Sequence, residues 1–211
     1  MAGKPDTDTI YETLRDRVCL LDYPPGTILR ETELAQEFGV SRTPIRAVLQ
    51  RLAHGRLVAP KDGVGTIVTE PDAGEIRDIY EMRLKVAELI GQMSPLPLTD
   101  NHARDAEAIQ RQARVLLTHF DIRTYWQINH RLHFLISGVI GNGALREVWD
   151  NLYFQSARFW YQYARSDPGP VAHALIREIE DVIRAIRVND PVALGYVQRN
   201  SIAAGLALLI R

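Results

Sequence analysis

The chain has 211 residues, of which 46% are hydrophobic and 24% are charged, and its formal net charge is -1. This composition is typical of a globular protein with one large or two small domains. The single cysteine, Cys19, excludes an internal disulfide framework and favours a reducing compartment. Residues 1–10 lack the apolar core of a signal peptide and no run of 18 apolar residues occurs, so we expect a cytoplasmic protein without a membrane span.

The first 55 residues predict three short helices. Breakers at 24–26 end the first helix, whose apolar stripe consists of Ile10, Leu14, Val18 and Leu21. We expect Thr32 to cap a second helix that stops at Gly39. We expect Ser41 to cap a third helix with Pro44 in its first turn, where a missing N–H costs nothing. The predicted buried stripe of this third helix is Ile45, Val48, Leu49 and Leu52.

A two-stranded hairpin is predicted directly after the third helix. Short strands at 57–59 and 66–68 flank a loop that contains Lys61, Gly63 and Gly65. Three helices followed by such a hairpin make a winged helix-turn-helix, which is a DNA-reading arrangement. We therefore expect residues 1–70 to form a winged helix-turn-helix DNA-binding domain.

The third helix lies in a strongly basic run of the chain. Between residues 41 and 61 there are five basic side chains and no acidic one. Arg42 and Arg46 are one helical turn apart and point the same way, so they could bond guanine O6 and N7 or clamp a phosphate. A solvated basic face would carry the same charge, but the preceding turn and the following hairpin favour DNA binding.

Beyond Pro71-Asp72 the sequence predicts helices and no strand. The expected helical segments are 73–93, 100–119, 121–140, 144–165, 170–188 and 191–210. The fold class is thus mainly α, with the winged helix-turn-helix followed by an all-α six-helix bundle. We expect residues 71–211 to form one all-helical domain for effector binding and dimerisation, because dimerisation doubles the DNA contacts and gives palindrome recognition.

Three polar residues fall on the apolar faces of these helices. Arg83 lies on such a face, and an inward arginine is costly unless it meets an anion. Asn129 and His133 point inward one turn apart, which can place two ligands on one metal or one substrate. Each could instead be a satisfied core residue, but the three together favour a pocket, with Tyr125 among its apolar walls.

The run GVSRTPIRAVLQRL at 39–52 closely resembles the DNA-binding domain of the GntR family of bacterial transcription regulators. The resemblance implies that Arg42 and Arg46 contact the operator and that Gly63 and Gly65 belong to the wing. Some relatives have an arginine where Thr32 stands, so the contacts at the start of the second helix are expected to differ. The candidate DNA-contacting residues are Thr32, Ser41, Arg42, Thr43, Arg46, Gln50, Lys61, Gly63 and Gly65.

Residues 73–210 resemble the all-helical FCD effector domain of the FadR-like subgroup of this family, in its shorter six-helix variant. That subgroup typically holds a divalent metal with an Asp-x-x-x-His pair and two later histidines. The matching positions here are Asn129, His133, Ile179 and Ser201, so only His133 keeps a ligand type and we expect no metal and no other cofactor. The candidate residues for a small carboxylate effector are Arg83, Tyr125, Asn129, His133 and Ser201.

The favoured interpretation is a homodimeric transcription regulator that binds a palindromic double-stranded operator and responds to a small organic acid. We expect it to be a repressor, because repression is the more common outcome in such families. One alternative is an effector-independent DNA-binding protein whose bundle serves only to dimerise. Another is a helical metal-dependent enzyme. The sequence lacks a nucleophile with a paired base, a carboxylate couple and a complete metal set, so we expect no enzyme activity.

Overall fold

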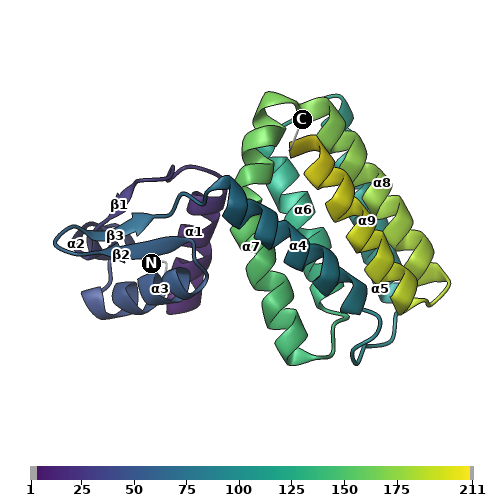
Figure 1. Ribbon diagram of the computed structural model, residues 1–211, viewed down its shortest axis with the longest axis horizontal. Helices are drawn as coiled ribbons and strands as arrows, with labels where there is room; N and C mark the ends of the chain where they lie inside the picture. The colour runs from purple at the N-terminus through teal and green to yellow at the C-terminus, as the bar shows by residue number, and fades with distance from the viewer. Residues whose placement is uncertain (1–3, 210–211) are drawn as a thin grey trace. The chain divides into compact units, whose positions relative to one another are not determined.

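The computed structural model describes residues 4–209, whose contacts divide at Glu75 and Ile76 into two compact units (Figure 1). The predicted fold class is confirmed: a small helical unit with a short sheet precedes an all-helical unit. Over the described residues, no helix is both long and apolar enough to cross a membrane.

The first unit contains three helices and an antiparallel sheet. The helices are α1 (Thr7–Cys19), α2 (Glu31–Phe38) and α3 (Arg42–His54), and the strands are β1 (Ile28–Leu29), β2 (Val58–Lys61) and β3 (Gly65–Val68). The predicted hairpin is β2 and β3. Strand β1 was not predicted and pairs with β3, placing Ile28 opposite Ile67 and giving the order β1-β3-β2. A two-residue strand is too short to show an alternating pattern, so only its partner reveals it.

The predicted capping of α2 and α3 needs correction. Arg30, not Thr32, is the N-cap of α2, because the chain leaves β1 at Leu29 and enters the helix at once. Ser41 is the N-cap of α3, as expected, but its side chain makes no capping hydrogen bond. Gly39 ends α2 in the left-handed region at a φ of 65°, a conformation that favours glycine.

The core of the first unit forms where α1 packs against α3. All four residues of the predicted α3 stripe are buried, as are Ile10, Leu14 and Val18 of α1. Leu21 does not extend this stripe, because α1 ends at Cys19 and Leu21 has a φ of 62°. Leu20 is buried in its place. This core fixes α3 so that its opposite face stays exposed.

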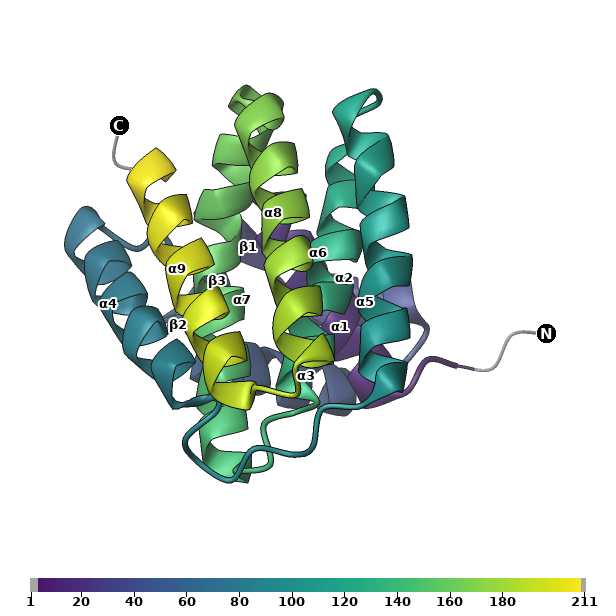
Figure 2. The same ribbon diagram turned by 90° about the vertical axis from the view of Figure 1, so that its right-hand side faces the viewer.

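The second unit contains the six predicted helices within its described residues. They are α4 (Ala73–Leu89), α5 (Asp100–Ala113), α6 (Ile122–Ser137), α7 (Gly143–Ser166), α8 (Pro168–Arg187) and α9 (Pro191–Leu209). The segment predicted as 100–119 is interrupted, because a 3-10 turn, η1 (Arg114–Leu117), follows α5. Helix α8 contacts both α5 and α9, and Figure 2 shows the helices of this unit standing side by side.

Two glycines bring α9 close to the C-terminal end of α4. A Cβ atom at Gly195 would lie 2.7 Å from the carbonyl oxygen of Ala87, and one at Gly91 would collide with the carbonyl of Pro191. Backbones can approach this closely only where no side chain intervenes. The close approach positions α4 against the bundle, and α4 carries Tyr80 and Arg83.

Candidate DNA-reading surface and effector cavity

The residues predicted to contact DNA are all exposed in the first unit. Arg42 and Arg46 keep 59% and 60% of their side-chain surface accessible, so a duplex can reach both guanidinium groups. Thr43 and Gln50 are exposed on the same helix, opposite the buried stripe. The geometry required for a recognition helix is therefore present in α3.

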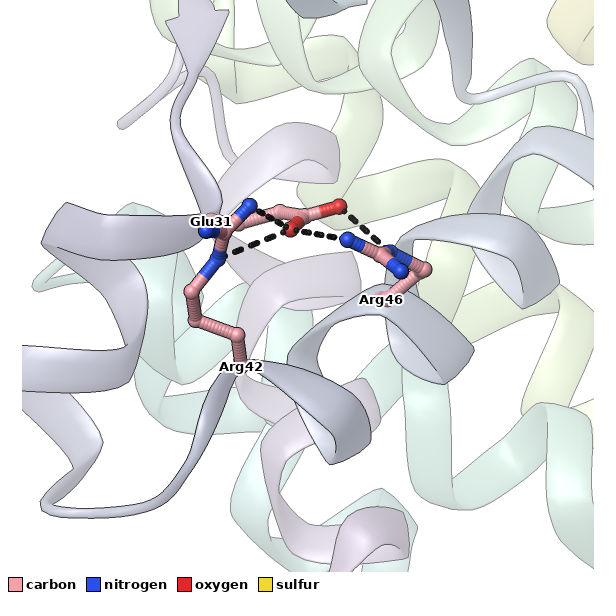
Figure 3. A network of polar contacts seen from close by, with 3 residues as sticks. All are labelled: Glu31, Arg42 and Arg46. Atoms are coloured by element: carbon pink, nitrogen blue, oxygen red, sulfur yellow. Dashed lines mark hydrogen bonds and ion pairs between the residues drawn. The ribbon is translucent and has the colours of Figure 1, made fainter.

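A carboxylate that sequence reasoning missed lies between the two arginines. Figure 3 shows the Arg42 and Arg46 guanidinium groups on either side of Glu31, which is the first residue of α2. Arg42 donates from Nε and Nη2 to Glu31 Oε2, at 3.2 and 2.8 Å. Arg46 donates from Nε to Oε1 at 2.9 Å and from Nη2 to Oε2 at 3.0 Å. We call these three residues the Glu31 clamp.

The clamp orients both arginines and leaves part of each donor set available. Each guanidinium carries five N–H groups and uses its Nε–Nη2 edge on Glu31. The Nη1 group and the outer proton of Nη2 remain to form a parallel pair of bonds with guanine or phosphate. The hydrogen bonds from Arg46 and Arg42 lower the pKa of Glu31 from its ordinary value of 4.5 to about 2, so the carboxylate is ionised at neutral pH.

The wing is a tight turn between β2 and β3. The Val64 N–H donates to the Lys61 carbonyl at 3.0 Å, and Gly63 within this turn has a φ of 72°. Gly65 opens β3 with a φ of 123°. Both values lie in the region that favours glycine, so the two glycines shape the turn, and Lys61 is exposed beside it.

The basic run does not form one continuous surface. Arg51 donates to Asp8 of α1 at 2.7 Å, and its guanidinium lies 3.7 Å from the centre of the Tyr11 ring. This arginine therefore ties α3 to α1. The charge available around the recognition helix is smaller than the sequence count suggests, because Glu31 also offsets part of it.

The second unit encloses a cavity of about 240 Å³. Its walls come from five helices, and they include each of the five residues that the sequence nominates for an effector: Arg83, Tyr125, Asn129, His133 and Ser201. These residues belong to α4, α6 and α9, which are distant in the sequence. The structure thus brings the nominated residues together around one space.

Asn129 and His133 are both held by neighbours. The Asn129 Nδ2 group donates to the Tyr161 hydroxyl at 2.9 Å. His133 is buried, with its Nε2 atom 2.8 Å from Asp150 Oδ1 and its ring stacked at 3.8 Å on Tyr153. Asp150 fixes the orientation of the imidazole, so His133 forms a rigid part of the cavity wall.

Arg83 is half-buried and lines the cavity from α4. Its guanidinium lies 5.4 Å from the centre of the Tyr80 ring, which is within the range of a cation–π contact. Tyr125 lies deeper in the wall and its hydroxyl accepts a hydrogen bond from Trp160 Nε1. Burial raises the pKa of Tyr125 well above its ordinary value, so this hydroxyl stays neutral.

Sequence reasoning missed the acidic side of the cavity. Glu178 and Asp181 of α8 line it, as does Arg177. The Glu178 Oε1 atom accepts a hydrogen bond from Gln198 Nε2 at 3.0 Å, and burial raises the pKa of this carboxyl. The position of Glu178 next to Ile179, on a predicted inward stripe, could have indicated that it lies near the cavity. It was passed over because a glutamate on a helix is ordinarily solvated.

The residues at the positions of the subgroup's metal site do not fit a metal ion. Ile179 is fully buried and offers no ligand atom, and the Asn129 amide nitrogen donates to Tyr161. Between residues 4 and 209, no group of three or more His, Cys, Asp or Glu side chains could hold a metal ion. One imidazole beside Asp150 falls short of the three or four protein ligands that a zinc site uses.

The sequence and the fold match known regulators. Residues 6–68 match "Bacterial regulatory proteins, gntR family" and residues 78–203 match the FCD domain. An uncharacterized HTH-type transcriptional regulator from an unstable DNA locus of Streptomyces ambofaciens is 30% identical over 70% of this chain and 60% of its own length. The Escherichia coli repressor RspR is 21% identical over 89% of this chain and 81% of its own length.

A solved structure of E. coli McbR/YncC has the same fold, with a TM-score of 0.77 and 18% identity over 100% of this chain and 98% of that chain. The two matched regions coincide with the winged helix-turn-helix and with the helical bundle. Proteins of this kind regulate transcription by binding operator DNA and are not enzymes. The chain therefore belongs to the GntR family of bacterial transcription regulators and carries the FCD domain.

Proposed function

We propose that this regulator is a homodimeric repressor that binds a palindromic operator and responds to a small organic acid bound in the second unit. Repression is supported by the names of two relatives, the RspR repressor and the gluconate operon repressor of Bacillus licheniformis. Because a regulator of this kind acts on DNA, we place it in the cytoplasm. A homodimer presents two copies of α3, and a two-fold symmetric protein matches a palindrome.

The DNA half of the proposal rests on the exposed Glu31 clamp. Arg42 and Arg46 would read or grip the operator, with Thr43, Gln50 and Ser41 contributing polar contacts from α3 and its cap. The wing residues Lys61, Gly63 and Gly65 would follow the sugar-phosphate backbone, and Thr32 would lie at the edge of the contact. Phosphate contacts position the protein and base contacts specify the sequence.

The cavity is the observation that carries the effector half. Arg83 supplies a positive charge for a carboxylate, while Asn129, His133 and Ser201 border the same space and Tyr125 adds an apolar wall. Helix α4 carries Arg83 and begins at Ala73, close to the division between the two units. A ligand that binds one arrangement of α4 more tightly than another would shift the DNA-binding equilibrium by that difference.

Thermal unfolding with a library of small organic acids tests the effector half. A ligand that binds only the folded state raises Tm by mass action, so at least one acid should stabilise the protein and change its operator affinity. Arg83→Met should abolish that stabilisation, whereas Arg77→Met, an exposed position on the same helix, should preserve it. If no acid shifts Tm or operator affinity, the protein is better described as an effector-independent dimeric DNA-binding protein.

A further inference from the structure

The cavity presents side chains of both charges. Arg83 and Arg177 line it together with Glu178 and Asp181, and Asp181 is also paired with Arg184. A charge that leaves water needs a compensating charge around it. A simple anion would leave the Glu178 carboxyl without a positive partner, whereas a ligand that also carries a cation would supply one.

Glu178 has unused capacity as an acceptor. An ionised carboxylate offers about four acceptor sites, and the only hydrogen bond to this carboxyl from residues 4–209 is the one from Gln198 Nε2 at 3.0 Å. In the same described range, no Lys, Arg or His nitrogen lies within 4.0 Å of it. Glu178 is half-buried, and a partly desolvated carboxyl is stabilised by a strong donor, which the cavity can admit.

Arg83 is the complementary group on α4. Among the described residues, no carboxylate lies within ion-pair distance of its guanidinium, and its contact is with the face of the Tyr80 ring. Burial raises the pKa of Glu178 and the Arg83 charge partly opposes this effect, so the two groups act on each other across the cavity. Each can bind a ligand group of the opposite charge.

Aromatic rings complete the wall around these charges. Tyr80, Tyr125, Trp160 and Tyr161 all border the cavity. The face of such a ring attracts a cation as well as apolar groups. The volume of about 240 Å³ lies below the roughly 300–1,000 Å³ of sites for drug-sized ligands, which restricts the ligand to a small molecule.

We propose that the effector is a small zwitterion of the amino-acid type, with its carboxylate on Arg83 and its ammonium group on Glu178. The inference rests on the proposed function and narrows its ligand class from small acids in general to acids that also carry a cation. The Gln198 amide holds the Glu178 carboxyl in place, and the aromatic rings enclose the rest of the ligand.

Calorimetric titration of the full chain with three matched series tests the proposal. The probes are the L-amino acids, the carboxylic acids that lack only the amino group, and the amines that lack only the carboxyl group. An amino acid should bind at least about tenfold more tightly than either of its truncated partners, because each partner lacks one of the two charge-assisted hydrogen bonds. An acid that binds as tightly as its amino acid overturns the zwitterion but leaves an acid-responsive regulator.

Glu178→Gln assigns the ammonium site. This nearly isosteric change should weaken the amino acid about tenfold or more while leaving the affinity for its deaminated acid unchanged. Glu147→Gln is the matched control, since Glu147 is exposed on α7 and does not line the cavity. Equal weakening of both ligands by Glu178→Gln, with unchanged circular dichroism, would place the ammonium elsewhere and overturn the assignment. If none of the three series and no other acid binds, the proposed ligand response fails as well.

Discussion

Removing the charge of Glu31 should make DNA binding tighter but less selective. In Glu31→Gln the four bonds from Arg42 and Arg46 lose their ionised acceptor, although an amide of the same shape remains. One negative charge also disappears from the centre of the recognition surface. The guanidinium groups become freer to meet any phosphate and less fixed for a particular base, so specific and non-specific binding should respond differently.

The expected magnitudes follow from these contacts. If one further phosphate is neutralised, the slope of log K against log salt should steepen by about 0.9 for non-specific DNA. A bidentate arginine–guanine pair contributes about 1–3 kcal/mol of discrimination. Loosening both arginines should therefore lower the ratio of specific to non-specific affinity about tenfold, which corresponds to about 1.4 kcal/mol.

Fluorescence anisotropy at several salt concentrations measures both affinities, using an operator selected from random duplexes with the parent protein and a scrambled duplex. Glu33→Gln is the matched control: it removes the same charge from the same helix, but Glu33 pairs with Arg30 at 2.9 Å and does not contact the clamp. If the two variants show the same specificity ratio, Glu31 acts only through net charge and the positioning argument is wrong.

Three other predictions follow from single contacts. Arg46→Ala should weaken operator binding by about 1–3 kcal/mol, and an unchanged affinity in the same anisotropy assay would exclude Arg46 as a base reader. Because the folded-state pKa of Glu31 is about 2 against an ordinary 4.5, its ion pairs should stabilise the fold above about pH 4.5 and lose this effect as the pH falls toward 2. With solvent screening allowed for, the stability gap between parent and Glu31→Gln in urea unfolding should be about 1 kcal/mol at pH 7 and should shrink by pH 3; a constant gap contradicts the linkage. Gly195→Ala should cost about 1–3 kcal/mol of unfolding free energy, since its Cβ would press on the Ala87 carbonyl, whereas Gly169→Ala, with open space around it, should not destabilise the fold.

The sequence was sufficient where burial is a local, periodic property. The stripe of Ile45, Val48, Leu49 and Leu52 and the order of the helices were readable because helical burial repeats every three or four residues. Strand β1 could not be predicted from the sequence, because its two residues form a strand only through their pairing with Ile67 and Thr66. The same holds for the cap of α2, where the end of β1 sets the start of the helix.

The missed site residues are acids that come near arginines only in the folded chain: Glu31 contacts Arg42 and Arg46, and Glu178 lines the same cavity as Arg83. Glu31 is 11 residues from Arg42 and 15 from Arg46, and Glu178 is on a different helix from Arg83. A search for basic patches or metal ligands gives no weight to a single carboxylate. In the first unit Glu31 fixes the direction of two arginines, and in the second unit we propose that Glu178 binds the positive group of the ligand.

The glycine contacts indicate how a ligand at Arg83 could act on α4. Gly91 and Gly195 hold the C-terminal end of that helix against α9, whereas Arg83 lies nearer its middle and Ala73 at its start. If the C-terminal end of a rigid helix is held, a displacement at its middle moves mainly its N-terminal end. That end leads into the DNA-reading unit, so we expect Gly195→Ala to weaken the effect of ligand on operator affinity even where the ligand itself still binds.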